Sequence, residues 1–340
     1  MSAPARRPRI VVLRALGLGD LLTGVPALRA LRRRFPDHEL VLAAPGRLAA
    51  AVAATGCADR LLTTTSPDRG VPRELDWHGP PPALAVDLHG NGQDSLRPLR
   101  ALNPGRLIGY ADSAAGPPGG AVWRADEHER ERWCRLLRCH GVPADPGDLR
   151  IPCPPQPPCA PGAVLIHPGA DAGSRRWPAE RFAEVAHELR LTGRPVIVTA
   201  GAGEGELARR VATLAGLPPA SVLGGTADVP FDALAALVAH AAALVAGDTG
   251  LSHLATALGT PSVTLFGPVS PVLWGPPAAA RHRVLWRPDA GDGDRPGNAH
   301  GSRPDPRLLR VRPADVLSEL DVLLRLPEPG KDGSRCAAVP

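Results

Sequence analysis

The chain has 340 residues, a formal net charge of +5 and 44% hydrophobic residues. This length and composition indicate a globular protein with enough material for two domains. Aromatic residues make up only 3% of the sequence and the arginines are dispersed, which argues against a nucleic-acid-binding surface. The mild basic excess instead suits anionic partners such as nucleotide phosphates or a phospholipid surface.

The cysteines and the apolar runs bear on the location of the protein. The six cysteines include no CxxC pair and no histidine stands at zinc spacing, so we expect a reduced, cytosolic chain without bound metal. No run approaches the ~18 apolar residues of a membrane span, and the apolar segment after the basic N-terminus is too short for a signal peptide. The sequence therefore predicts a cytoplasmic protein and leaves open a peripheral contact at the inner face of the membrane.

Short apolar strands alternate with helices in the first part of the chain, which is typical of an open parallel α/β sheet. Pro26 falls early enough in the first helix to be tolerated there. We expect strands at residues 10–13, 39–43, 60–63, 83–88 and 106–109, and helices after residue 20 to about 34, from 46 onward, and at 127–139.

A proline-rich segment interrupts this alternation. Eight of the 21 residues from 141 to 161 are proline, which neither a helix interior nor a central strand accepts. We therefore expect a linker at 146–161 between Rossmann-like domains at 1–145 and 162–326, and a disordered tail at 327–340. In the second domain we expect strands at 163–166, 195–199, 222–223, 243–246 and 262–266, and helices at 178–191, 205–215, 231–240 and 312–326.

Residues 287–307 are rich in Gly, Asp, Pro and Arg and are typical of a mobile loop. Asp289, Asp292 and Asp294 resemble part of a calcium-binding loop, but no glutamate closes it at the required spacing. We therefore expect no metal site in this segment.

The first strand leads into a glycine-rich turn at residues 17–22 (GLGDLL). A dinucleotide-binding turn would have a third glycine where Leu22 stands, and the carboxylate of Asp20 would repel a pyrophosphate. At a helix N-terminus Asp20 is instead suited to act as a general base on a hydroxyl, because the helix dipole keeps it ionised. The alternative is that Asp20 only caps the helix.

A second segment, residues 167–178 (HPGADAGSRRWP), lies between a strand and a helix. Its glycines allow close backbone approach, and Ser174, Arg175 and Arg176 stand at the mouth of the helix. The two guanidinium groups could stabilise a leaving diphosphate, although an adjacent arginine pair could equally be solvated surface. Trp177 is expected to pack and Pro178 to start the helix.

The most informative segment is residues 245–261 (VAGDTGLSHLATALGTP), which reads as a buried strand, a sharp turn and a short helix. Such a turn places free backbone N–H groups and a helix dipole beside a carboxylate and an imidazole. A diphosphate could bind the helix N-terminus while Asp248 accepts hydrogen bonds from sugar hydroxyls. The alternative is that Asp248 is only an N-cap and His253 only a satisfied buried histidine.

Together these segments resemble glycosyltransferase family 9, the heptosyltransferase family that includes lipopolysaccharide core enzymes. The resemblance spans roughly residues 9–286. It rests on R-x-L-G-x-G-D-x-x-x-x-x-P at 14–26, H-P-G-A with R-R-W-P at 167–178, and G-D-T-G-L-S-H-L-A-x-A-L-G-T-P at 247–261 with L-F-G-P after it. Weaker matches are V-D-L-H-G at 86–90 and R-L-I-G-Y at 106–110.

The resemblance implies a GT-B fold, in which two facing Rossmann-like domains hold the active site in the cleft between them. It makes residues 1–145 the acceptor-side domain and 162–326 the nucleotide-sugar donor domain. It implies an inverting transfer, without metal or cofactor, of a sugar to a hydroxyl of a glycan, glycolipid or small-molecule acceptor. The donor that it implies is ADP-heptose, and the biological setting is the cell envelope or lipopolysaccharide biosynthesis.

By matching positions, Asp20 corresponds to the family's proposed catalytic base, and Arg175 stands where many members carry lysine. Gly19 and His89 fall on the acceptor side. The residues implied in donor or phosphate binding are Ser174, Arg175, Arg176, Glu204, Asp248, Thr249, Gly250 and His253.

Other functions remain open on the same residues. A nucleotide-sugar epimerase or hydrolase could use the same fold, because a double Rossmann architecture does not dictate chemistry. A catalytically silent nucleotide-sugar-binding protein is a further alternative. An NAD-dependent oxidoreductase is disfavoured by Leu22 and Asp20 in the first turn.

Overall fold

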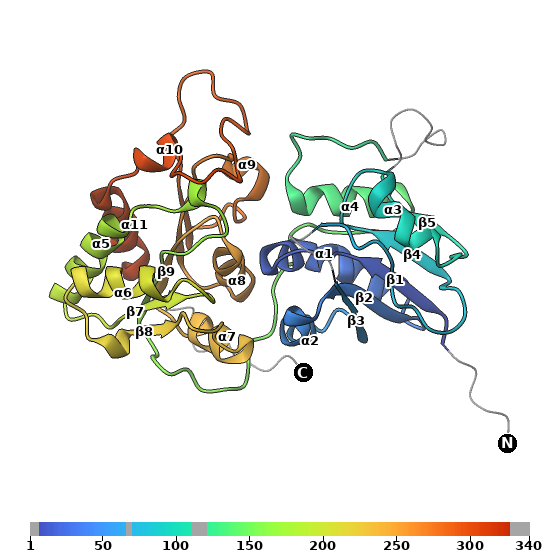
Figure 1. Ribbon diagram of the computed structural model, residues 1–340, viewed down its shortest axis with the longest axis horizontal. Helices are drawn as coiled ribbons and strands as arrows, with labels where there is room; N and C mark the ends of the chain where they lie inside the picture. The colour runs from blue at the N-terminus through green and yellow to red at the C-terminus, as the bar shows by residue number, and fades with distance from the viewer. Residues whose placement is uncertain (1–6, 66–69, 111–120, 327–340) are drawn as a thin grey trace. The chain divides into compact units, whose positions relative to one another are not determined.

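The computed structural model describes residues 7–65, 70–110 and 121–326 (Figure 1). The tail expected at 327–340 lies outside these ranges. The chain divides into two compact units, Met1–Leu149 and Arg150–Pro340, and this boundary falls inside the proline-rich segment.

The first unit contains a parallel five-stranded sheet in the order β3-β2-β1-β4-β5. Its strands are β1 (Arg9–Leu13), β2 (Glu39–Pro45), β3 (Arg60–Thr64), β4 (Leu84–Asp87) and β5 (Leu107–Ile108), and its helices are α1 (Leu18–Arg34), α2 (Ala49–Thr55), α3 (Gln93–Arg100) and α4 (Glu129–Cys139). In the central strand β1, Leu13 lies opposite Ala43 on one side and Asp87 on the other. Residues Ile10–Leu13 of this strand are apolar and buried, because neighbouring strands and packed helices cover them.

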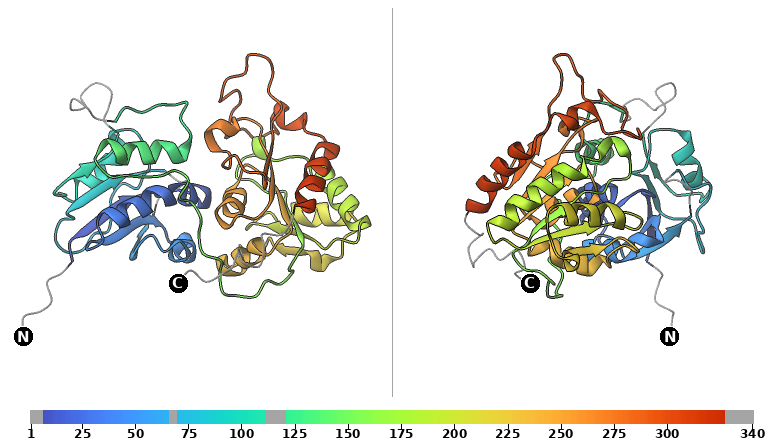
Figure 2. Two further views of the ribbon diagram at one scale, coloured as in Figure 1. Left: turned by 180° about the vertical axis from the view of Figure 1, so that it is seen from behind. Right: turned by 60° about the vertical axis from the view of Figure 1, so that its left-hand side comes forward.

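The second unit contains a parallel six-stranded sheet in the order β11-β10-β9-β6-β7-β8. Helices α5, α6 and α11 pack together on one face, and α7 and α8 pack together on the other (Figures 1 and 2). The strands are β6 (Val164–His167), β7 (Val196–Ala200), β8 (Val222–Gly224), β9 (Ala243–Gly247), β10 (Ser262–Leu265) and β11 (His282–Leu285). The helices are α5 (Ala179–Leu191), α6 (Gly205–Leu214), α7 (Phe231–Ala239), α8 (Gly250–Leu258), α9 (Pro271–Trp274), α10 (Pro306–Leu309) and α11 (Pro313–Arg325).

The expected strands and helices are confirmed, but four short elements were not predicted. They are α3, α9, β11 and α10. Pro98 lies inside α3 and reads as a helix breaker in the sequence, whereas the buried Leu96 and Leu99 hold the helix against the sheet. β11 has only its last residue fully buried, so it lacks the apolar run that marks the other strands.

The segment expected as a mobile loop, residues 287–307, makes specific contacts with its own unit. The N–H of Ser270 donates to the carbonyl of Asp294 at 2.8 Å, and the N–H of Gly297 donates to the carbonyl of Pro268 at 3.0 Å. Asp292 forms an ion pair with Arg307 at 2.6 Å. The two backbone hydrogen bonds fasten the segment to the loop that follows β10, and the ion pair joins two parts of the segment itself.

Both sheets reverse their strand order at one place, which determines where loops from distant parts of the sequence converge. The reversal lies between β1 and β4 in the first unit and between β6 and β9 in the second. In open α/β sheets, ligands bind beyond the carboxyl ends of the strands at such a point. The glycine-rich turn follows β1, and the two glycine-containing segments of the second unit follow β6 and β9.

No helix in the described ranges is both long and apolar enough to span a membrane. Four of the described cysteines, Cys57, Cys134, Cys139 and Cys159, are free thiols.

Candidate functional site

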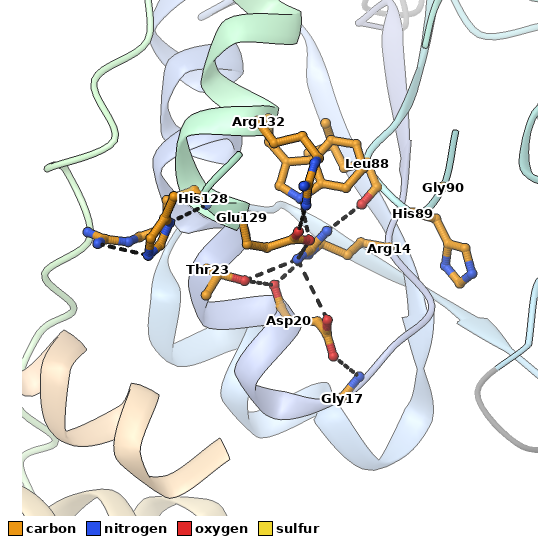
Figure 3. Close-up of polar contacts among 12 residues, drawn as sticks. Arg14, Gly17, Asp20, Thr23, Leu88, His89, Gly90, His128, Glu129 and Arg132 are labelled. Carbon is orange, nitrogen blue, oxygen red and sulfur yellow. Dashed lines mark hydrogen bonds and ion pairs between the residues drawn. The ribbon is translucent and has the colours of Figure 1, made fainter. Parts of the chain in front are cut away.

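Asp20 lies in the first turn of α1, directly after β1. Its Oδ2 accepts a hydrogen bond from the N–H of Gly17 at 3.0 Å, so the carboxylate bends back over the start of its own helix (Figure 3). Its Oδ1 lies 3.9 Å from Nη2 of Arg14, and 23% of the side chain is exposed. Gly19 is the preceding helical residue and is half-buried. Asp20 therefore has a capping role, and its side chain also stays partly exposed.

The Arg14 side chain is wholly buried and holds this turn in place. Its Nε donates to the carbonyl oxygen of Asp20 and its Nη1 to the carbonyl oxygen of Leu88, at the end of the neighbouring strand. Its Nη2 donates to Oγ1 of Thr23 at 3.1 Å. A Cβ at Gly24 would lie 2.9 Å from Cδ of Arg14, so the missing side chain there lets the arginine stem pass. Arg14 thus joins the loops after β1 and β4.

Glu129, at the start of α4, supplies the counter-charge for Arg14. Its Oε1 lies 3.2 Å from Nη2 of Arg14 and accepts from Nε1 of Trp133 at 2.8 Å. Its Oε2 pairs with Arg132. Burial by itself would raise the pKa of Glu129, but Arg14 and Arg132 outweigh it and hold the pKa below its usual range. No local pattern in the sequence predicts this role of Arg14 and Glu129.

His89 follows β4, and the Asp20 turn follows the parallel neighbouring strand β1, so both lie at the carboxyl ends of the strands. Its Nδ1 accepts from the N–H of Ala15 at 3.1 Å. The Oδ1 of Asp87 accepts from the N–H of His89 at 2.8 Å and from that of Gly90 at 3.3 Å. Burial raises the pKa of Asp87 to about 6, whereas burial and then Arg14 lower the pKa of His89 to about 4. The imidazole is therefore neutral at physiological pH.

In the second unit, Asp248 lies between two cationic or potentially cationic side chains. It follows β9, and its Oδ2 lies 3.4 Å from Nη1 of Arg175 while its Oδ1 lies 3.6 Å from Nε2 of His253. His253 also packs edge-on against Trp274, with ring centroids 6.0 Å apart. The helix N-cap is Thr249 and not Asp248, so the simple capping interpretation of Asp248 does not apply. The structure therefore brings together Arg175, Asp248 and His253.

The N-terminus of α8 begins beside this cluster. Thr249 is the N-cap and Gly250 the first helical residue, so the first backbone N–H groups of the helix lack intrahelical partners. Nε of Arg175 and Oγ1 of Thr249 are buried without a hydrogen-bond partner among the described residues. Buried donors are normally paired, and unpaired ones in one place are typical of a site that a ligand completes. The charge and geometry here suit an anion.

Ser174 and Arg176 flank Arg175, but only Arg175 lies beside Asp248. The N–H of Ser174 donates to the carbonyl of Gly301 at 2.8 Å, and its buried Oγ has no partner among the described residues. Nε of Arg176 donates to the carbonyl of Ala170 at 2.9 Å and the residue is exposed, so this arginine braces its own loop. A Cβ at Gly247 would lie 2.9 Å from the carbonyl oxygen of Arg175, which explains the glycine there. Of the adjacent arginines, Arg175 is the one beside Asp248.

The expected packing role of Trp177 is confirmed. It is buried, donates through Nε1 to the carbonyl of Val311 at 3.1 Å, and packs edge-on against Phe182. Trp177 therefore anchors the start of α5.

Glu204 lies in the loop after β7, next to the loop after β6. Its Oε2 accepts from the N–H of Gly201 at 2.9 Å, and a Cβ at Gly169 would overlap its carboxylate. Burial lowers the pKa of His167 although Glu204 lies near it. Asp228, which no motif in the sequence marks, accepts from the N–H of Ala202 at 2.8 Å. Glu204 and Asp228 thus flank one turn, and only the fold reveals the second carboxylate.

Comparison with known proteins shows the family of the chain. The family model of glycosyltransferase family 9 (heptosyltransferase) matches residues 150–293. The chain is 33% identical over 361 residues to lipopolysaccharide heptosyltransferase 2 of Escherichia coli, a match that covers 93% of this chain and 98% of that protein. It is 30% identical over 164 residues to an E. coli lipopolysaccharide heptosyltransferase 3, covering 47% of this chain and 46%, about half, of that protein.

Solved structures show the same fold. The chain superposes on a glycosyltransferase family 9 protein from Veillonella parvula with a TM-score of 0.73 and 20% identity, covering 95% of this chain and 99% of that one. It superposes on E. coli ADP-heptose lipopolysaccharide heptosyltransferase II with a TM-score of 0.71 and 20% identity, covering 93% and 98%.

Two Rossmann-like units, each with glycine-containing loops at its switch point, give the chain the GT-B fold of the superposed structures. The protein belongs to glycosyltransferase family 9, the heptosyltransferase family.

Proposed function

We propose that the protein transfers heptose from ADP-heptose to a hydroxyl of a lipopolysaccharide core acceptor, with inversion at the anomeric carbon and without a metal ion. The observation that carries this proposal is the cluster of Arg175, Asp248 and His253 beside the N-terminus of α8. The relatives that match over nearly the whole chain or half of it are lipopolysaccharide heptosyltransferases.

In this proposal the second unit binds the donor. Negative charge grows on the diphosphate as the glycosidic bond breaks, and the Arg175 guanidinium with the N-terminal amides of α8 would stabilise it. These groups supply the positive charge without a metal ion. Asp248 orients Arg175 and accepts from sugar hydroxyls, and Glu204 faces the ribose or adenine.

The first unit supplies the base. The Oδ1 of Asp20 takes the proton of the acceptor hydroxyl as that oxygen attacks the anomeric carbon from the side opposite the diphosphate. A new glycosidic bond forms, the bond to the diphosphate breaks, and ADP leaves. This single displacement inverts the anomeric centre.

The test is a donor screen on the full chain. Calorimetric titration with ADP, GDP, UDP and dTDP should show binding of ADP in preference to the others. Mass spectrometry with ADP-heptose and a deacylated lipopolysaccharide core should then detect one added heptose and free ADP. Product formed without acceptor would favour an epimerase or hydrolase, and donor binding without any product would favour a silent binding protein.

A further inference from the structure

The two nitrogens of the His89 ring have different surroundings. Nδ1 lies 3.1 Å from the backbone nitrogen of Ala15. A backbone N–H can only donate, so Nδ1 must present its lone pair, and a neutral ring then carries its proton on Nε2. This contact fixes both the tautomer and the direction of the ring.

Burial, with the positive charge of Arg14 added to it, keeps the ring neutral. The Arg14 guanidinium lies close enough to add to the effect of burial, and together they lower the pKa of His89 to about 4. The carboxylate of Asp87 is directed to the backbone N–H of His89 and not to the ring. An imidazole with a protonated outer nitrogen cannot accept a proton there, but it can donate a hydrogen bond. His89 is therefore unsuited to act as a general base.

The position of His89 places this hydrogen-bond donor at the point where the strand order of the first sheet reverses. β4, which ends at Asp87, lies beside β1, and α1 with Asp20 follows β1. His89 is half-buried, and none of the described residues accepts a hydrogen bond from its Nε2. Figure 3 shows the His89 ring turned away from the Arg14–Glu129 contacts, whereas Arg14 contacts the backbone of both Asp20 and Leu88. Through these contacts the buried Arg14 holds the loop that carries His89 and the turn that carries Asp20 in place together.

We propose that Nε2–H of His89 donates a hydrogen bond to an oxygen of the acceptor sugar, beside the hydroxyl that Asp20 deprotonates. His89 thereby positions the acceptor, and its backbone contact to Ala15 keeps the donor hydrogen pointing outward. This inference rests on the proposed glycosyl transfer and adds an acceptor-binding residue to it.

Two substitutions separate the ligand contact from the structural contact. In His89→Asn the amide oxygen can replace Nδ1 as acceptor for the Ala15 N–H, but the outward donor is lost. In His89→Gln the amide nitrogen can reach the position of Nε2 and retain the outward donor. A role as donor to the acceptor predicts damage from asparagine and rescue by glutamine, and a purely structural role predicts the reverse.

The assay uses the full chain with ADP-heptose and deacylated lipopolysaccharide core. We expect His89→Asn to raise the acceptor KM by about 2- to 12-fold, the range of one net hydrogen bond. ADP affinity by calorimetry and the Tm should stay at the wild-type values, and His89→Gln should recover the acceptor KM. Activity of wild type and His89→Gln should show the same pH dependence between pH 5.5 and 8.

The results that overturn the inference are specific. An asparagine variant with an unchanged acceptor KM, or a glutamine variant as impaired as asparagine, shows that Nε2 does not contact the acceptor. A wild-type chain that forms no glycoside would overturn the proposed function as well, and that failure is visible before any variant is made.

Discussion

Replacement of Asp20 by asparagine tests the central chemical step. Asparagine has almost the same shape as aspartate, and its amide oxygen can still accept from the N–H of Gly17, as Oδ2 does at 3.0 Å. The change removes the negative charge and the ability to take up a proton. We therefore expect Asp20→Asn to fold and to bind ADP with wild-type affinity, and to lose most of its transfer rate.

The structure offers a matched control for the capping role. Asp315, in the first turn of α11, accepts from the N–H of Arg312 at 2.9 Å and lies 3.4 Å from that guanidinium, and so repeats the capping contact of Asp20 beside an arginine. Loss of a carboxylate at a helix N-terminus typically costs ~0.3–1 kcal/mol. Both asparagine variants should lose about this much free energy of unfolding. Only Asp20→Asn should lose a general base, which is worth ~10²–10⁴-fold in rate.

The measurement is kcat for heptose transfer at saturating ADP-heptose, together with ADP affinity and urea unfolding for both variants. The deficit of Asp20→Asn should appear in kcat, and Asp315→Asn should transfer at the wild-type rate. If Asp20→Asn keeps a near-wild-type kcat, Asp20 is only a cap and the proposed mechanism is wrong. Equal loss of activity in both variants would assign the effect to helix stability.

Three further predictions follow from the contacts. Arg175→Ala should weaken ADP binding about 10- to 100-fold by calorimetry, because a charge-assisted hydrogen bond worth ~1.5–3 kcal/mol is lost. Arg176 does not contact the Asp248 carboxylate, so Arg176→Ala should bind ADP like the wild type. Equal losses of affinity in the two variants would contradict this assignment. Glu129→Gln should lower the free energy of unfolding by ~3–5 kcal/mol because it leaves buried cations unpaired. Since the pKa of Glu129 is depressed, the stability that this carboxylate contributes is present above the ordinary value of 4.5 and is lost as the pH falls. The urea midpoints of variant and wild type should therefore converge on acidification and not stay parallel. The pKa of Asp87 is raised from 3.8 to about 6, so folding takes up a proton there. The pKa of His89 is lowered from 6.5 to about 4, so folding releases a proton there. The contributions of the two groups to the slope of unfolding free energy against pH therefore nearly cancel between pH 4 and 6. His89→Gln removes the His89 slope and keeps the Asp87 slope, so the urea stability of the variant should fall relative to that of the wild type as the pH rises from 4 to 6, and a relative rise would refute the assignment of these pKa shifts.

Much of the fold follows from local sequence patterns. Runs such as Ile10–Val11–Val12–Leu13 predict buried parallel strands because both faces and both edges of such a strand are covered by apolar neighbours. Alternation with helices then predicts the α/β class. α3 escaped prediction because Pro98 argues against a helix locally, and only packing of the buried Leu96 and Leu99 overrides it. The order of the strands in each sheet also cannot be predicted from local sequence patterns, because it depends on which strands meet in space.

The sequence by itself determined the segments that carry the candidate site: the turn with Asp20, the loop with Arg175 and the turn with Asp248. Glycines and helix starts mark these positions in the local sequence. Only the tertiary structure decided which side chains support them. Arg14 meets Glu129 across 115 residues, and Ala15 meets His89 across 74. The charge and tautomer of such groups depend on burial and on neighbours brought together by the sheet, and no periodicity in the chain encodes either.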